Sequence, residues 1–222
     1  LAAYPPGKGD ITNMIRSYIH RCQKDGVKIV MNCEVTPELI KEEKPDSVII
    51  ATGSKTLILP IEGIDNPAII HGSDLLDGKR AAGKKVLVVG GGMVGCETAA
   101  FLGEQEHDVT VIEFRDTVGA DVIHEHRVYL MKDFEDYGIK EITGAKVCKF
   151  YEDGVEYETA DGVRHESRGY DSVILSMGFR NYNPLEEKIK DLVPETHVIG
   201  DAIRARRALD ATKEAYEVAS RI

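Results

Sequence analysis

The stretch of sequence that decides the fold runs from Lys84 to Leu102 and reads KKVLVVGGGMVGCETAAFL. An apolar strand leads into a Gly-x-Gly-x-x-Gly turn, and a helix of small residues follows the turn. Gly90 permits the tight turn, and Gly92 lets a ligand approach the backbone because it has no Cβ atom. Gly95 lets the helix pack closely on its strand. This combination predicts a strand–turn–helix unit that binds phosphate groups.

The same turn predicts a dinucleotide site. The free amides of Gly92, Met93 and Val94 at the start of the helix would bind a pyrophosphate. A second strand, residues 108–113 (DVTVIE), ends in Glu113, about 20 residues beyond the glycines, where a carboxylate accepts both adenosine ribose hydroxyls. That carboxylate would repel a 2′-phosphate, so the sequence favours NADH over NADPH, and Arg115 would soften the preference. The alternative is a tight βαβ packing turn that binds no ligand.

Composition limits the classes of function. The chain has 222 residues, of which 42% are hydrophobic and 30% charged, enough for a core in one or two domains. Its net charge of −10 argues against nucleic acid or an anionic membrane as a partner. No apolar run has the length of a membrane span, and the N-terminus has no signal-peptide pattern. We therefore expect a cytoplasmic protein.

Periodicity and turn residues predict alternating helices and strands on both sides of the glycine turn. Before the turn we expect a helix over 10–24, a strand over 27–30, a helix over 37–43 and a strand over 47–51. After Glu113 we expect a helix over 121–136, a strand near Ile139, an antiparallel meander over 146–151, 155–159 and 163–167, a strand over 171–176, a strand and turn over 197–201, and a final helix to Ile222.

Other chemically suggestive residues carry weaker predictions. His124 and His126 are two apart, so on a helix they would not face one another and a metal pair is not favoured. Arg204, Arg206 and Arg207 would meet either a flavin phosphate or, more simply, solvent or a neighbouring domain. The cysteines form no Cys-x-x-Cys, which excludes an encoded redox disulfide or metal site, and each is expected to be a small buried thiol: Cys22, Cys33, Cys96 and Cys148.

Short motifs along the chain occur in a recognisable order: ATGS at 51–54, the turn at Gly90, SMGFR at 176–180 and IGD at 199–201. Their order and spacing resemble the two-dinucleotide flavoprotein oxidoreductases, in which an NAD domain is inserted between two halves of an FAD domain. PPGKGD at 5–10 and EVTPE at 34–38 narrow the resemblance to flavin-containing enoate and dienoyl-CoA reductases. These enzymes also resemble trimethylamine dehydrogenase and bile-acid-inducible NADH:flavin oxidoreductases.

The resemblance implies roles for individual residues. Gly178 would border the nicotinamide, and Glu97 resembles the acid near the nicotinamide ribose or carboxamide. The alternative for Glu97 is a favourable interaction with the helix N-terminus, in whose first turn we place it. Thr52 and Gly53 belong to a cofactor-binding signature. Asp201 resembles the acid that accepts a ribityl hydroxyl of FAD, with the following helix pointing its positive end at the flavin, and the alternative is an N-cap or an Asx turn.

The resemblance also implies an α/β fold, a doubly wound Rossmann-like NAD domain inserted into an incomplete FAD-binding domain of the same general fold. We expect the FAD-binding part at residues 1–74 and 169–222 and the NAD(H)-binding domain at 75–168, with the meander as its crossover. The strands that begin at Ser47 and Asp171 and the strand that ends at Asp201 should share one sheet. An incomplete half-domain should expose an apolar patch or pair with another copy.

Segments that such enzymes carry upstream are absent from this sequence: an FMN barrel, the cysteines of an iron–sulfur cluster, and a first Gly-x-Gly-x-x-Gly for FAD. We therefore interpret the chain as part of a longer enzyme that passes electrons from NADH to FAD and onward to a centre that reduces a C=C bond. No catalytic side chain is predicted, because hydride transfer is cofactor chemistry. Alternatively, the chain alone is an NAD(H)-binding module without turnover. A disulfide reductase is disfavoured because Cys-x-x-Cys is missing.

Overall fold

The glycine-rich turn sits at the end of a central strand of a five-stranded parallel sheet. In the computed structural model, which describes residues 2–222, the chain forms two units. The first consists of residues 2–25 and Ile58–Gly178, and the second of Gly26–Leu57 and Phe179–Ile222. The sheet belongs to the first unit, and its strands follow the order β3 (Ile70–His71), β10 (Ser172–Leu175), β4 (Lys85–Val89), β5 (Asp108–Ile112) and β6 (Lys140–Ile142).

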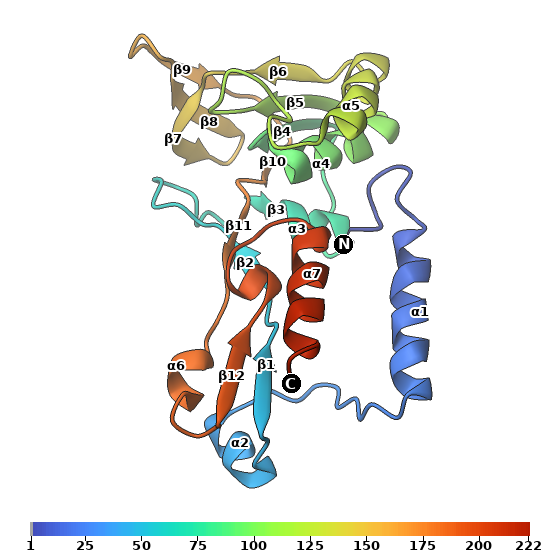
Figure 1. Cartoon of the computed structure of the whole chain (residues 1–222). Coiled ribbons are helices and arrows are strands. Elements are labelled where there is room, and N and C mark those ends of the chain that lie inside the picture. The colour runs from blue at the N-terminus through green and yellow to red at the C-terminus, as the bar shows by residue number, and fades with distance from the viewer. Residues whose placement is uncertain (1) are drawn as a thin grey trace. The chain divides into compact units, whose positions relative to one another are not determined.

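Apolar residues cover both faces of this sheet, as a parallel sheet requires. Successive side chains of a strand point to opposite faces, so Val86 and Val88 pack on one side and Leu87 and Val89 on the other. The first face meets α4 (Met93–Glu104) and α5 (His124–Asp136). The second face meets an antiparallel meander, β7 (Lys146–Tyr151), β8 (Gly154–Glu158) and β9 (Arg164–Ser167). Figure 1 shows the helices and the meander on opposite sides of the sheet.

The meander is the connection from β6 back to β10, as predicted. The chain leaves β6 at one edge of the sheet, makes the meander, and returns as β10 beside β4. The short helix α3 (Gly72–Leu76) precedes β4. The observed fold is therefore the expected α/β class, with a β-meander in place of helices on one face.

The second unit holds two short strand pairs. Strand β1 (Ser47–Ile50) pairs in parallel with β12 (Glu195–Val198), and β2 (Ser54–Thr56) pairs antiparallel with β11 (Phe179–Asn181). Its helical elements pack with or follow these strands: α2 (Pro37–Glu43), α6 (Glu186–Ile189), the 3-10 turn η1 (Gly200–Ala202) and α7 (Ala208–Ala219).

One predicted strand does not form. Residues 27–30 have no regular secondary structure, because an apolar, β-branched sequence becomes a strand only where a partner strand is available. The side chains of Val27, Ile29, Val30 and Met31 are exposed. The predicted helix 10–24 forms as α1 (Ile11–Lys24), yet it buries none of its residues. Both segments expose apolar side chains, and the expected patch or pairing with another copy stays a prediction.

The expectation that the strands from Ser47 and Asp171 share one sheet is wrong. Strand β10 pairs with β4 and β3 in the first unit, whereas β1 pairs only with β12 in the second. All four residues of β10 are buried, so this strand needs neighbours on both edges and cover on both faces. The sheet therefore extends beyond the predicted limits of 75–168. The assignment of an NAD-binding and an FAD-binding role to the two parts stays a prediction.

Close backbone contact at the glycine turn explains why glycine is needed there. An added Cβ atom at Gly95 would run into the carbonyl oxygen of Gly90, and one at Gly90 would run into the carbonyl oxygen of Ser176. Gly90 also has φ +107°, a conformation that other residues rarely adopt. The turn thus packs α4 against the ends of β4 and β10 without room for a side chain.

We expect Gly95→Ala to lower the free energy of unfolding by about 1–3 kcal/mol, because its methyl group meets rigid backbone rather than a flexible side chain. Gly9→Ala is the matched control, since a Cβ atom there meets nothing within 4 Å. Urea denaturation followed by circular dichroism measures both variants. Equal stabilities of the two variants would contradict the close-packing argument.

Candidate functional site

The predicted glycine-rich turn between β4 and α4 forms, and its role toward a pyrophosphate stays a prediction. Gly90 follows β4 directly, and α4 begins at Met93 with Gly92 as its N-cap. The amide of Cys96 already donates to the Gly92 carbonyl oxygen (2.9 Å), so the first helical bond is closed. The amides of the first turn are the groups expected to bind an anion, because no helical carbonyl precedes them.

Glu113 lies at this turn. One carboxylate oxygen accepts a hydrogen bond from the amide of Gly91 (2.6 Å), and the other accepts one from the amide of Arg115 (2.9 Å). A carboxylate offers about four acceptor positions, so each oxygen can still accept a hydroxyl group. The structure therefore brings Glu113 beside the glycine turn. Its role toward a ribose stays a prediction, as does that of the exposed Arg115.

A second carboxylate at the turn was missed by sequence reasoning. Asp121 accepts a hydrogen bond from the amide of Met93 (3.0 Å), the first residue of α4. It lies in the loop between β5 and α5, where no periodic pattern marks a residue as functional. An added Cβ atom at Gly92 would lie 3.3 Å from a carboxylate oxygen of Asp121. Because Gly92 has no side chain, the carboxylate of Asp121 can lie close to its backbone.

Glu97 is a buried carboxylate with a cationic partner. It is 7% exposed and pairs with the ammonium group of Lys8, and the Nε2 atom of His126 lies 3.8 Å from the same oxygen. The placement of Glu97 in the first turn of its helix is wrong. Since α4 begins at Met93, Glu97 lies in the second turn, and the first turn contains no acidic residue. The Lys8 partner was also missed, although it belongs to the PPGKGD motif.

Gly178 and Gly53 are required by their backbone conformations. Gly178 has φ +97° and Gly53 has φ +74°, and an added Cβ atom at either would meet nothing within 4 Å. Steric crowding therefore does not by itself explain these glycines. Thr52 donates its hydroxyl hydrogen to the carbonyl oxygen of Tyr182, and the amide of Tyr182 donates to the Gly53 carbonyl (3.0 Å). Thr52 and Gly53 thus form hydrogen bonds with Tyr182, the residue that follows β11.

Asp201 is hydrogen-bonded within the second unit. It accepts from the Ser54 hydroxyl (3.2 Å) and from the amide of Arg206 (3.0 Å). The N-cap alternative is wrong, because α7 begins only at Ala208 and has Arg207 as its N-cap. Asp201 lies within the single turn η1, and the helix expected after it forms as α7, which begins at Ala208. A role of Asp201 toward FAD stays a prediction.

The amide of Gly200 is also occupied by a carboxylate. Glu214 of α7 accepts from it (2.7 Å) and pairs with Arg206 (2.5 Å). The hydrogen bond from Arg206 and that from the Gly200 amide lower the pKa of Glu214, so this carboxylate is ionised at neutral pH. Arg207 lies 3.9 Å from Asp210. Arg206 and Arg207 thus both have acidic neighbours within the second unit.

The cysteines do not form one class. Cys96 is buried and burial raises the pKa of its thiol to about 12, which keeps it protonated and unreactive at neutral pH. The prediction that all are buried is wrong, since Cys33 is exposed and Cys22 and Cys148 are half-buried. Within residues 2–222 no three His, Cys, Asp or Glu side chains are grouped to hold a metal ion.

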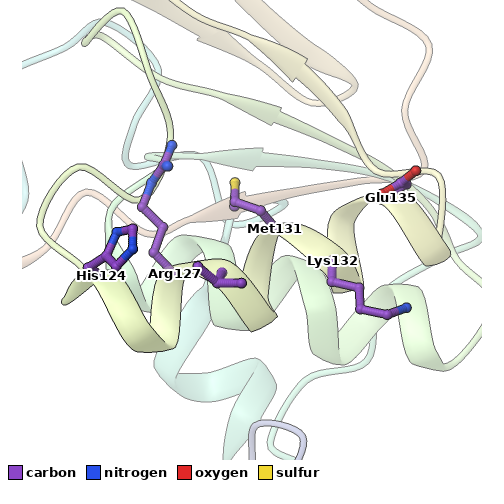
Figure 2. A pocket seen from close by; sticks show the side chains of 6 residues that line it. His124, Arg127, Met131, Lys132 and Glu135 are labelled. Atoms are coloured by element: carbon purple, nitrogen blue, oxygen red, sulfur yellow. The ribbon is translucent and has the colours of Figure 1, made fainter.

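A shallow hollow of about 350 Å³ lies along α5. Figure 2 shows His124 and Arg127 near the start of this helix and Glu135 towards its end. One helix supplies the whole lining: His124, Arg127, Val128, Met131, Lys132 and Glu135. None of these residues was predicted to bind a cofactor. As for membranes, no helix in the described part of the chain is both long and apolar enough to span one.

The predicted residues fall into two groups. Gly90, Gly92, Met93, Val94, Gly95, Glu97, Glu113, Arg115 and Gly178 belong to the first unit, and Thr52, Gly53 and Asp201 belong to the second. Each unit therefore contains its own set of candidate residues. The first combines the glycine turn with Glu113, Asp121 and the Glu97–Lys8 pair, and it is the more complete candidate site.

Comparisons with known proteins give the family context. The sequence profile of a family described as pyridine nucleotide-disulphide oxidoreductase matches residues 10–196. The chain is 30% identical to a cinnamate reductase of Clostridium sporogenes over 98% of this chain and 33% of that protein. It is 31% identical to an NADH oxidase of Thermoanaerobacter brockii over 100% of this chain and 35% of that protein.

A solved structure of a 2-naphthoyl-CoA reductase in complex with 2-naphthoyl-CoA matches with a TM-score of 0.92 and 31% identity. The match covers 100% of this chain and 34% of that one. The chain thus spans about a third of the length of these relatives. The resemblance to enoate-reducing flavoproteins is confirmed.

The buried ion pair leads to a stability prediction. We expect Lys8→Met to lower the free energy of unfolding by about 1–3 kcal/mol, because it leaves a buried carboxylate without its charged partner. Adding Glu97→Gln to that variant should recover part of the loss, so the effects of the single variants should not add. Chemical denaturation measures the complete cycle. Lys132→Met, which breaks an exposed pair with Asp136, serves as control and should change stability little.

Proposed function

The chain belongs to the pyridine nucleotide-disulphide oxidoreductase family, and from this premise we propose that it is the NADH-binding, electron-transfer part of a larger flavoprotein reductase. It is an oxidoreductase module of the NAD(P)H flavoprotein type. The finer steps of the proposal are NADH as the preferred nucleotide, FAD as the electron acceptor, and a centre outside this chain that reduces a C=C bond.

One observation supports NADH as the preferred nucleotide. The Glu113 carboxylate lies 2.6 Å from the amide of Gly91 at the turn between β4 and α4. In this arrangement a pyrophosphate on the first amides of α4 leaves the adenosine ribose beside an acid at the end of the next strand. Such an acid accepts the hydroxyl groups of NADH and repels the additional phosphate of NADPH. The residues present therefore fit NADH.

Fewer residues support FAD binding, and they lie in the second unit. Thr52, Gly53 and Asp201 match the late FAD signatures, but the chain contains no second Gly-x-Gly-x-x-Gly turn to hold the flavin's pyrophosphate. The amide of Gly200 is already bonded to Glu214. We therefore propose that FAD binds weakly to this chain alone. Bound together, the two cofactors would supply hydride transfer, and FMN and an iron–sulfur cluster are proposed to lie outside the chain.

A second candidate is an NAD(H)-binding module that does not turn over by itself. The incomplete set of FAD residues favours this possibility for the isolated chain. A disulfide reductase is less well supported, because the sequence lacks Cys-x-x-Cys and the Cys96 thiol is held protonated by burial. Flavin absorbance of the purified chain, before and after addition of FAD, distinguishes an electron-transfer module from a binding module.

The exposed apolar side chains of residues 27–31 indicate where a partner would bind. Val27 is 55% exposed and Met31 is 75% exposed, and the segment has no regular secondary structure. An extended apolar segment of this kind readily adds to another sheet. We propose that the other domains of the longer enzyme cover it, and that a second copy of the chain covers it when those domains are missing.

We expect NADH to bind more tightly than FAD to the 222-residue chain, because only the NADH site has both its glycine turn and its ribose acid. NADH fluorescence and flavin fluorescence give the two dissociation constants under identical conditions. A smaller dissociation constant for FAD than for NADH would contradict the proposal.

Glu113 is expected to set the preference for NADH. Glu113→Ala should weaken NADH binding by about 1–3 kcal/mol and reduce the preference over NADPH, because the ribose hydroxyls lose an acceptor and a 2′-phosphate loses a repelling charge. Arg115 would then attract that phosphate. Glu113→Gln, which keeps the shape, is the control that separates charge from contact. If the unmodified chain binds NADPH as well as NADH, this role of Glu113 is wrong.

A further inference from the structure

We propose that Asp121 is an internal anion that occupies one of the pyrophosphate-binding amides, that of Met93, and that an incoming dinucleotide must displace it. Asp121 would thereby set the affinity of the site for ligands that carry a diphosphate. This inference rests on the proposed binding of NADH at the glycine turn, and it adds a residue that neither the family motifs nor the sequence pattern identified.

The position of the carboxylate supports the proposal. One oxygen of Asp121 accepts the hydrogen bond of the Met93 amide at 3.0 Å. The other lies 3.3 Å from the point where a Cβ atom of Gly92 would stand. Gly92 and Met93 contribute two of the three amides expected to bind the pyrophosphate. Asp121 therefore occupies the same space, with the same charge sign, as the ligand.

The surrounding loop is fixed, while the carboxylate is accessible. The amide of Gly119 donates to the carbonyl oxygen of Gly91 at 2.7 Å, and Val118 and Val122 on either side are buried in the core. Asp121 itself is exposed to solvent. A ligand can therefore reach it and displace it by side-chain rotation alone, since the buried neighbours keep the backbone in place.

The charges around the turn disfavour the binding of an anionic ligand in place of Asp121. Glu113 already places a second carboxylate at the Gly91 amide. Arg127, a nearby cation, is engaged with the Thr117 hydroxyl at 2.9 Å and with the Val118 carbonyl oxygen at 3.2 Å. A diphosphate that enters this site meets two carboxylates. Glu113 compensates by accepting the ribose hydroxyls in the proposed complex, whereas Asp121 only competes, so removal of the Asp121 charge should strengthen diphosphate binding.

A purely structural role is the competing explanation. Gly92 has no side chain with which to cap α4, so Asp121 would provide that cap from the loop. In that case removal of its charge would lower the stability of the chain and leave ligand affinity unchanged. Stability and affinity therefore have to be measured on the same variants.

The test uses the full 222-residue chain with Asp121→Asn, which keeps an acceptor for the Met93 amide but removes the charge. Asp116→Asn is the matched control, because Asp116 lies in the same exposed loop. Calorimetry with NADH, ADP and adenosine should give about three- to tenfold tighter binding of NADH and ADP to Asp121→Asn than to Asp116→Asn, through relief of charge repulsion. Adenosine, which has no phosphate, should bind both variants equally.

The possible outcomes test the role of Asp121 separately from the proposed NADH site. If the unmodified chain binds NADH and Asp121→Asn binds ADP no more tightly than the control does, Asp121 is not a competing anion and the NADH site remains. Binding that appears only in Asp121→Asn supports the inference directly. If neither the unmodified chain nor any variant binds NADH or ADP, both the site and the inference are wrong. Asp121→Ala, with thermal unfolding, separates loss of the cap from loss of charge.

Discussion

The close approach of three backbone segments at the carboxyl end of β4 is the constraint on which the first unit depends. Gly90, Gly95 and Ser176 meet there with no room for a Cβ atom on either glycine. This contact fixes the start of α4 over the ends of β4 and β10. The first amides of α4 therefore lie at the edge of the sheet where Glu113, the residue after β5, accepts from the Gly91 amide. The geometry of the candidate site is thus a consequence of packing.

The same packing creates a set of backbone amides that must be satisfied without helical partners. Side-chain carboxylates meet this need in both units: Glu113 and Asp121 at the glycine turn and Glu214 at Gly200. A carboxylate at such an amide stabilises the turn by electrostatic attraction. It also makes the turn less attractive to a second anion. Stability of the turn and affinity for phosphate groups therefore oppose one another at these positions.

Most of the fold could be predicted from local patterns. The apolar run before the glycine turn predicted β4, the turn predicted α4, and the run at 108–113 predicted β5. The three short segments over 146–167 predicted the meander, because periodicity and turn chemistry are properties of neighbouring residues. The partner of β10 could not be predicted. Strands β1 and β10 are both short apolar runs followed by a glycine-containing turn. Which strands each of them pairs with depends on tertiary packing. For the same reason, residues 27–30 suggested a strand that has no partner.

The candidate site was predicted to the extent that its residues lie at ends of regular elements. Glu113 could be placed at the turn, because parallel strands end at the same edge of a sheet. Asp121 and Lys8 could not, since they lie in loops that are 28 and 89 residues from their partners Met93 and Glu97. These two contacts differ in strength. Asp121 is an exposed carboxylate on a neutral amide, whereas Glu97 is buried against an ammonium group, and leaving such a carboxylate without its partner costs about 1–3 kcal/mol. A ligand that binds at α4 is therefore expected to replace the first carboxylate and to leave the second in place.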